Sequence, residues 1–447
     1  MGDVRAVDPL LQRLGDEEWR VRAAAYEALV ALGDVRAFEP LKRRLGDRDD
    51  WVRAAACEAL GALGDVRAVD PLLQRLGDEE WRVRAAACRA LGALGDVRAF
   101  EPLKRRLGDR DDWVRAAACE ALGALGDVRA FEPLLQRLGD GDSDVRAAAS
   151  EALGKLGFGA EAQLLSEALE AKTEAVEQLR ARIAGGEERL WRPLLAALAD
   201  SEADFAAVSR LLGALGDVRA VEPLLQRLGD GDSDVRAAAC RALGALGDVR
   251  AFEPLLQRLG DGDSDVRAAA CRALGALGDV RAVEPLLQRL GDGDSDVRAA
   301  ACRALGALGD VRAVEPMLPL VEPEPGFGYG DIQTAACVAL AKLGCERVWE
   351  KIPRMLKSQN EVARVAACEA MGILGGERAV RTLLRQLNRE DSSVRAAACK
   401  ALGRIGDARA VNAIIQLTLQ EKHQEVLEAA QEALNRLLPA PQQGESS

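Results

Sequence analysis

A block of 31 residues recurs along nearly the whole chain, and this repeat limits the folds open to it. Each regular copy opens with Gly-Asp-Val-Arg-Ala, and weaker copies keep the glycine and the arginine. The regular openings lie at Gly2, Gly33, Gly64, Gly95, Gly126, Gly216, Gly247, Gly278 and Gly309, and the weaker ones at Gly344, Gly375 and Gly406. The step from Gly157 to Gly216 fits two degenerate, slightly shorter units that start near Gly157 and Gly186. Self-similarity at this period is typical of stacked supersecondary units, so we expect about fourteen of them.

The unit that opens at Gly126 predicts two helices. Asp127 can cap the first helix, whose leucines fall on one side at helical spacing. A turn rich in Gly and Asp then leads to a second helix over 145–153, which Gly154 and Gly157 are expected to end. The small residues there are expected to let neighbouring helices approach closely. Pro133 lies inside the first helix, so that helix is expected to be bent. No segment alternates with the period of a strand, and we predict an all-α fold of stacked helix pairs.

Breaks in the pattern divide the chain. We expect regular repeats over 2–156, two degenerate repeats over 157–215, regular repeats over 216–343 with an inserted loop at 319–331, C-terminal repeats and a cap over 344–438, and a disordered tail over 439–447. The first unit begins directly with the consensus, and only Tyr26 and Val30 are bulkier than usual. Its outer apolar face is therefore expected to be uncapped, which would permit end-to-end self-association.

Charge and hydropathy exclude several classes of partner. The net charge is −12, so the chain carries no overall positive field for nucleic acid or an anionic membrane. No apolar run is long enough to span a bilayer, and the N-terminus lacks the apolar core of a signal peptide. These features predict a cytoplasmic protein that binds neither nucleic acid nor membrane.

Nine of the ten cysteines share one repeat position. They are Cys57, Cys88, Cys119, Cys240, Cys271, Cys302, Cys337, Cys368 and Cys399. Other repeats place Tyr26, Ser150 or Ala430 there, which indicates a small, buried packing position. Successive sulfurs would lie about one repeat apart, too far for a disulfide, and no Cys-x-x-Cys spacing is present for zinc. Free thiols fit a reducing compartment.

Other sequence patterns resemble metal or catalytic sites, but each lacks a residue that the chemistry needs. The run Asp140-x-Asp142-x-Asp144 imitates a calcium loop, but Val145 stands where such a loop needs glycine. His423 is the single histidine, and no nucleophile–base arrangement or phosphate-cradling glycine loop is present. We therefore expect no enzyme activity, no metal and no cofactor.

The unit GDVRAVEPLLQRLGDGDSDVRAAACRALGALG resembles the HEAT-like repeat first named from phycobilisome lyase subunits. The likeness rests on the Gly-Asp opening, the proline, the Asp-Val-Arg start of the second helix and its Ala-Leu-Gly end. It implies a right-handed α-solenoid whose second helices line the concave face, with Asp140, Arg146 and their equivalents as a polar ladder between units. A related di-iron enzyme, deoxyhypusine hydroxylase, has paired His-Glu motifs; because the single His423 is followed by Gln424, that activity is excluded.

Three groups of residues are candidates for binding a protein partner. The first lies at the start of the second helices: Trp19, Arg20, Asp50, Trp51, Trp81, Arg82, Asp112 and Trp113. Such residues are typical of interface hot spots, although packing of the tryptophans between units is the competing interpretation. Arg241, Arg272 and Arg303 form a later row that is either a site or a solvated ladder. Phe327 and Tyr329 lie in the inserted loop, which is either a contact point or a bland insertion.

These observations favour a protein-binding scaffold that holds a protein partner of unknown identity. Two alternatives remain open. One is a bilin lyase or chaperone-like subunit that acts on a pigment-binding protein, which the resemblance implies. The other is a regulatory or sensor array cut from a larger multidomain protein.

Overall fold

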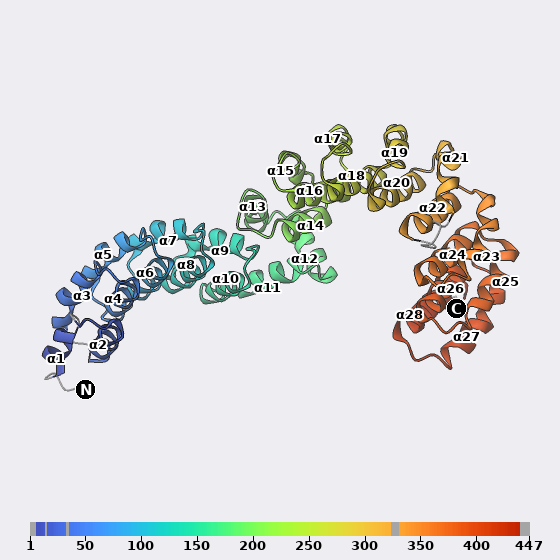
Figure 1. Ribbon diagram of the computed structural model, residues 1–447. Coiled ribbons are helices and arrows are strands. Elements are labelled where there is room, and N and C mark those ends of the chain that lie inside the picture. Colours follow the sequence, from blue (N-terminus) through green and yellow to red (C-terminus); the bar gives the residue numbers. More distant parts are fainter. Residues whose placement is uncertain (1–5, 14–15, 33–34, 323–329, 439–447) are drawn as a thin grey trace, which may run out of the picture. The chain divides into compact units, whose positions relative to one another are not determined.

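The computed structural model describes residues 6–13, 16–32, 35–322 and 330–438. Within these ranges the regular elements are all helices, and one isolated antiparallel bridge joins Asp140 and Ala203, so the predicted all-α solenoid is confirmed. It falls into two compact units, Met1–Pro223 and Leu224–Ser447. In each unit short helices and longer helices alternate along the chain (Figure 1).

In the first unit a first helix and a longer second helix alternate up to α10. The α-helices are α1 (Val7–Arg13), α2 (Trp19–Leu32), α3 (Phe38–Arg44), α4 (Asp50–Ala62), α5 (Val69–Arg75), α6 (Trp81–Leu94), α7 (Phe100–Arg106), α8 (Asp112–Leu125), α9 (Phe131–Arg137), α10 (Ser143–Lys155), α11 (Gly159–Leu169), α12 (Thr173–Ala184), α13 (Glu188–Ala197) and α14 (Phe205–Leu215). Short 3-10 helices precede several first helices: η2 (Val35–Ala37), η3 (Val66–Ala68), η4 (Val97–Ala99) and η5 (Val128–Ala130).

The second unit repeats the same alternation. Its α-helices are α15 (Val221–Arg227), which crosses the boundary, α16 (Ser233–Leu246), α17 (Phe252–Arg258), α18 (Ser264–Leu277), α19 (Val283–Arg289), α20 (Ser295–Leu308), α21 (Val314–Met317), α22 (Asp331–Lys342), α23 (Ile352–Met355), α24 (Glu361–Leu374), α25 (Gly376–Gln386), α26 (Ser392–Ile405), α27 (Val411–Thr418) and α28 (Gln424–Leu437). Its 3-10 helices are η7 (Val249–Ala251), η8 (Val280–Ala282), η9 (Val311–Ala313), η10 (Leu318–Val321), η11 (Glu346–Glu350) and η12 (Ala408–Ala410), and η6 (Val218–Ala220) precedes α15.

The first helix of a repeat is built in two pieces. Asp127 caps the 3-10 turn η5 by accepting from the Arg129 backbone N–H, and α9 follows directly. Pro133 is the third residue of α9, in the first turn, where its missing N–H leaves no helical hydrogen bond unmade. The sequence predicted one helix bent at the proline. The structure instead has a 3-10 turn followed by an α-helix, and the change between them lies ahead of the proline.

The second helices pack directly on one another. Neighbours in the stack are α4, α6, α8 and α10 in the first unit, and α16, α18, α20, α22, α24, α26 and α28 in the second. The predicted helix end is confirmed at Gly157, which follows α10 with φ +87°, and is wrong at Gly154, which lies inside the helix. At the equivalent Gly123 of α8, a Cβ atom would lie 2.7 Å from the Ala152 Cα of α10. Glycine is thus needed there for the close approach of two helices.

A buried ion pair joins successive repeats. Arg115 Nε and Nη2 donate to the two carboxylate oxygens of Asp140, one repeat further on, at 3.0 and 2.9 Å. The same bond recurs between Arg53 and Asp78, Arg84 and Asp109, Arg236 and Asp261, Arg267 and Asp292, and Arg395 and Glu421. The ladder implied by the resemblance is therefore present at Asp140.

The ladder does not continue through Arg146. This arginine donates to the backbone carbonyls of Asp140 and Gly141 in its own turn, at 2.8 and 2.9 Å. The position 25 residues further on, where other repeats carry the acceptor carboxylate, is Ala171. The expectation that Arg146 joins two repeats is wrong, because the degenerate segment supplies no partner.

The degenerate segment also changes which helices are neighbours. Helices α11 and α12 pack on each other, and the chain then returns so that α13 packs against α9 (Figure 1). Two backbone hydrogen bonds secure the return: Gly141 N–H donates to Glu202 O at 2.8 Å, and Asp204 N–H donates to Gly139 O at 2.7 Å. As a result α13, not α11, continues the row of first helices beyond α9.

The structure buries all ten cysteines. The nine in the repeat position have no exposed surface, as their pattern predicts. Loss of solvation raises the pKa of the thiols of Cys88, Cys271 and Cys302 to about 12, from 9.0. These thiols stay protonated at neutral pH and cannot act as nucleophiles there.

We expect the folded chain to resist alkylation at mildly alkaline pH, because a thiol must be exposed and ionised to react. Iodoacetamide labelling followed by mass spectrometry checks this: almost no label in the folded chain, and ten labelled cysteines in concentrated urea. Cys345, which keeps 9% of its surface, should react first. Rapid labelling of Cys88 in the folded chain would contradict the burial of this cysteine position.

Candidate functional site

Three tryptophans lie at the start of successive second helices in the first unit. Trp51 and Trp113 are the second residues of α4 and α8, and Trp81 is the first of α6. Asp49 and Asp111 cap α4 and α8 by accepting from the backbone N–H of the tryptophan two residues on. The residues that follow Trp51 turn into the core, so the indole is left outside: Trp51 is 48% exposed and Trp113 54%.

The tryptophans and one arginine form a continuous stack, which we call the aromatic row: Trp51, Arg82, Trp81 and Trp113. The Arg82 guanidinium lies 4.6 Å from the Trp51 ring centroid and 4.5 Å from that of Trp81. Trp81 and Trp113 stack with their centroids 6.1 Å apart and their planes 28° apart. Arg82 Nη1 also lies 3.8 Å from an Asp50 carboxylate oxygen. Cation–π and stacking contacts each contribute roughly 0.5–1 kcal/mol at exposed positions, so the row is held before any partner arrives.

The two sequence interpretations of the tryptophans are combined in this arrangement. The rings do contact one another between repeats, as the packing interpretation requires. Trp51 and Trp113 nevertheless keep about half of their surface in water, as the interface interpretation requires. Asp112 lies next to the row and accepts from the Trp113 backbone N–H at 2.9 Å. Arg20 is exposed on α2, whereas the Trp19, Tyr26 and Val30 side chains, like Phe327 and Tyr329, lie outside what the structure describes.

The later arginine row lies in the other unit. Arg241, Arg272 and Arg303 are exposed at the same position of α16, α18 and α20, and no ion pair joins them to another described residue. In the first unit the same position is glutamate in every regular repeat except one, which has Arg89, and Arg89 Nη2 lies 3.9 Å from Glu58 Oε1. The structure therefore shows the arginines as free charges and leaves their role as a binding site a prediction.

One surface of the first unit was not predicted at all. A groove of about 880 Å³ lies between α7, α9 and α13, and six of its fifteen lining residues are Lys or Arg. The signal in the sequence was weak: Lys-Arg-Arg replaces the usual Leu-Gln-Arg at the end of α7. The groove depends on the placement of α13 beside α9, which the repeat pattern does not predict.

The described ranges contain neither a metal-binding cluster nor a membrane-spanning helix. No group of three or more His, Cys, Asp and Glu residues could hold a metal ion among those residues. No helix in that part of the chain has both the length and the apolarity to cross a bilayer. The absence of a catalytic function remains a prediction from the sequence.

Comparisons with known proteins bear on the fold. A family model described as HEAT repeats matches residues 1–60, 44–117, 102–184, 191–265, 252–327 and 352–435, in agreement with the resemblance stated above. No curated protein matches the chain. Among solved structures, the complex of CpcE and CpcF of phycocyanin lyase from Nostoc sp. PCC7120 is 25% identical over 49% of this chain and 94% of that chain, with a TM-score of 0.39.

Two further solved structures, of Kap121p and of importin beta, are similar over nearly the whole chain. Kap121p is 12% identical over 96% of this chain, with a TM-score of 0.46, and importin beta is 15% identical over 97%, with a TM-score of 0.47. The chain spans 53% of the length of Kap121p and 70% of that of importin beta. These are likenesses of fold.

Proposed function

We propose, since the chain belongs to the HEAT-repeat family, that it is a protein-binding scaffold whose aromatic row in the first unit binds a protein partner. The observation that carries this proposal is the stack of Trp51, Arg82, Trp81 and Trp113, in which two rings are half exposed. Tryptophan and arginine are the residues most enriched at binding hot spots. A fold of this kind can serve many tasks, so the proposal rests on this site and not on the family.

The stack is suited to binding because it is ordered in advance. Association ordinarily loses free energy when flexible side chains become fixed, at roughly 0.5–1.5 kcal/mol each. Here Arg82 is already held between two rings and beside Asp50, and Trp81 is already stacked on Trp113. A partner can therefore cover the exposed indole faces without fixing these side chains anew.

The spacing of the row indicates the form of the partner segment. The row crosses α4, α6 and α8, and packed helices lie roughly 8–10 Å apart. An extended chain advances about 3.3 Å per residue, so about three residues match one helix. We infer that an extended segment of about nine residues runs across the three helices, with apolar side chains against the indoles.

The remaining expectations are part of the same proposal. We place the protein in the cytoplasm and assign it no nucleic acid or membrane ligand. Three further ideas stay hypotheses. They are end-to-end self-association through the first repeat, a bilin lyase or chaperone-like subunit, and a regulatory or sensor array cut from a larger protein.

Replacing Trp51 and Trp113 together by alanine is expected to weaken partner binding by at least about 30-fold, because each lost hot-spot ring costs roughly 2 kcal/mol or more. The partner is first captured with the full chain and identified by mass spectrometry, and its Kd is then measured for each variant. Arg82→Lys keeps the charge but loses the flat stacking surface, so an intermediate loss is expected.

The matched control replaces Val66 and Val97 by alanine. Both are exposed apolar residues of the same unit, at 60% and 68%, and neither belongs to the row. Partner binding should remain within a factor of two of the parent, and far-ultraviolet circular dichroism should show equal helix content in all variants. Equal loss in the control and the tryptophan variant, or no loss in either, would exclude the row as the binding surface.

A further inference from the structure

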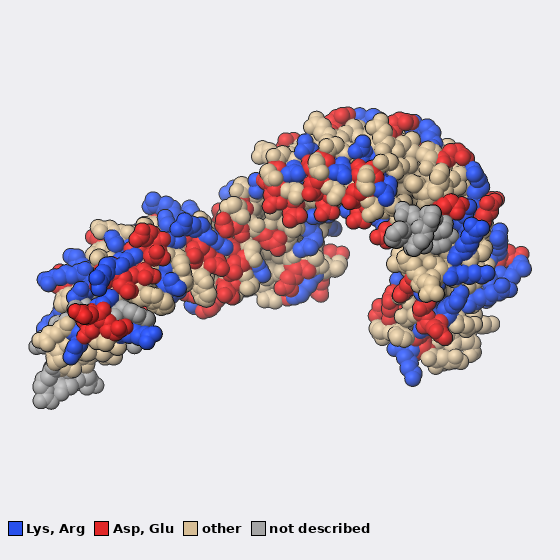
Figure 2. Space-filling view, viewed as in Figure 1, with Lys and Arg blue, Asp and Glu red and all other residues tan. Residues whose placement is uncertain are grey.

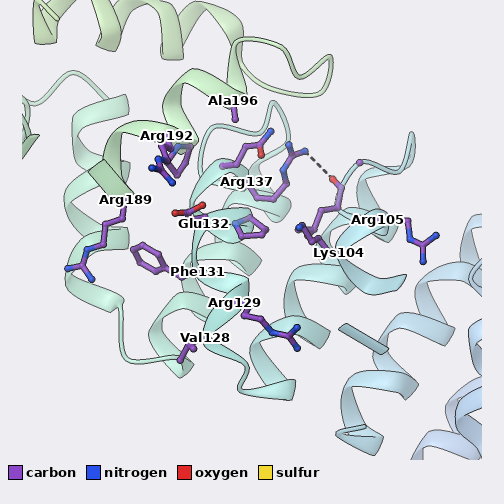
Figure 3. Close-up of a pocket in the computed structure, with 15 residues that line it drawn as sticks. Lys104, Arg105, Val128, Arg129, Phe131, Glu132, Arg137, Arg189, Arg192 and Ala196 are labelled. Carbon is purple, nitrogen blue, oxygen red and sulfur yellow. Dashed lines mark hydrogen bonds between the residues drawn. The ribbon is translucent and has the colours of Figure 1, made fainter. Parts of the chain in front are cut away.

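The basic groove of the first unit lies on the row of first helices and shares no residue with the aromatic row at the start of the second helices. Its volume is about 880 Å³, within the range of roughly 300–1,000 Å³ that is typical of ligand pockets. Figure 3 shows Arg189 and Arg192 on the α13 side and Lys104 on the α7 side, with Phe131 between them. Figure 2 shows Lys and Arg gathered over α7 and α9 in the first unit.

Basic residues outnumber acidic residues in the lining of the groove. Six of the residues that line it are basic, and Glu132 is the one acidic lining residue. Three of the six have carboxylate partners: Arg129 with Asp127, Arg137 with Asp140 and Asp200, and Arg189 with Glu161 and Glu187. Lys104, Arg105 and Arg192 make no ion pair with any described residue. Three basic side chains without a carboxylate partner are thus left on the walls of the groove, in a protein whose total charge is −12.

The floor of the groove is apolar. Phe131 is buried at the base of α9, and Arg189 lies over its ring at 5.5 Å. Pro133 and Pro193 lie on facing helices and also line the groove. An occupant that fits must therefore combine negative groups for the walls with apolar surface for the floor.

We propose that this groove binds an acidic segment of a protein partner, with carboxylates toward Lys104, Arg105 and Arg192 and an apolar side chain toward the half-buried Pro133. A nucleic acid strand fits less well, because single-stranded nucleic acid is ordinarily held by stacking on exposed aromatic rings, and Phe131 is buried. The acidic remainder of the chain would also repel a long polyanion. This site is separate from the aromatic row, so its failure would leave the proposed function standing.

The chain contains its own control for this proposal. Residues 33–63 and 95–125 are identical, so Lys42 of α3 is the exact sequence counterpart of Lys104 of α7. Beside α3 the structure has a smaller groove of about 460 Å³, which includes Asp70 and no residue of a third helix. The two lysines thus have the same local sequence, but only Lys104 lies in a groove to which α13 contributes a wall.

The test measures binding of a fluorescein-labelled hexaglutamate peptide to the full chain by fluorescence anisotropy at low salt. Lys104→Glu is expected to weaken binding at least about fivefold, since an exposed charge contact contributes up to roughly 1 kcal/mol and reversal adds repulsion. Arg192→Glu should have a similar effect, and Lys42→Glu should change the Kd less than twofold. All three side chains are on the surface, so circular dichroism should show the parent's helix content.

Each other outcome overturns the proposal. No binding of hexaglutamate by the parent chain would mean that the groove does not take acidic segments. Equal weakening by Lys42→Glu and Lys104→Glu would show general attraction to a charged surface and no site. Tighter binding of a single-stranded hexanucleotide, also lost in Lys104→Glu, would assign the groove to nucleic acid.

Discussion

Gly123→Ala is expected to destabilise the packing of α8 on α10 by roughly 1–3 kcal/mol, which is typical of an overpacked core. The added methyl group would lie 2.7 Å from both the Cα and the Cβ of Ala152, and one of these two atoms belongs to the backbone of the neighbouring helix. Neither helix can yield without also moving the ion pair between Arg115 and Asp140. The two repeats should therefore separate more readily.

Gly154→Ala is the matched control and should have the opposite sign. Gly154 occupies the same repeat position in α10, but nothing lies within 4 Å of a Cβ atom built there. Alanine favours a helix over glycine by roughly 0.5–1 kcal/mol, so this variant is expected to be slightly more stable than the parent.

The two glycine variants are best compared by hydrogen exchange, because repeat arrays open in parts and do not always unfold in one step. In Gly123→Ala, amide protons of α8 and α10 should exchange faster by a factor of about 5 to 150. In Gly154→Ala, protection of α10 should be equal to the parent or greater. Equal effects of the two substitutions would contradict the close approach of α8 to α10.

Arg115→Ala is expected to destabilise the same pair of repeats by about 3 kcal/mol. Arg115 and Asp140 are both almost fully buried, so removal of the arginine leaves a buried carboxylate with fewer partners. The expected value is at the low end of the range for broken buried pairs, because Arg137 Nη1 still lies 3.2 Å from Asp140. The loss of the hydrogen bond from Arg115 Nη1 to Asp109 O adds to the effect.

Arg146→Ala is the control for this prediction. Arg146 occupies the same repeat position but donates only to carbonyls of its own turn, so its removal should cost about 1 kcal/mol. Urea unfolding followed by circular dichroism would rank the two variants, and hydrogen exchange would localise the change. A loss in Arg146→Ala as large as that in Arg115→Ala would mean that the ladder across repeats is not what stabilises the stack.

The regular part of the fold could be predicted because its determinants are local and periodic. The caps, the helix period and the buried cysteine position recur every 31 residues, and each follows from residue types within one unit. At the position of Gly154 the sequence predicts both a helix end and a close approach of helices, and only the packed neighbour shows that the close approach is its role in other repeats. The prediction for Arg146 was wrong for a similar reason, because whether this arginine has a partner depends on a residue of the next repeat.

The candidate surfaces divide in the same way. The tryptophans of the aromatic row could be found from their spacing, but the sandwich of Arg82 between Trp51 and Trp81 depends on how two repeats stack. The basic groove could not be found, because it forms only where α13 returns to pack against α9. The repeat pattern is lost in that segment, so position in the sequence no longer predicts position in the stack.

Hydroxyl-radical footprinting of the full chain with and without its captured partner tests the central claim most directly. Oxidation of a tryptophan follows the exposure of its ring, and Trp51 and Trp113 are half exposed in the unbound chain. If the partner lies across the aromatic row, oxidation of both rings should fall several-fold on binding, while the buried Trp191 stays unreactive in both states. Unchanged oxidation of Trp51 and Trp113 in a saturated complex would place the partner elsewhere and contradict the proposed site.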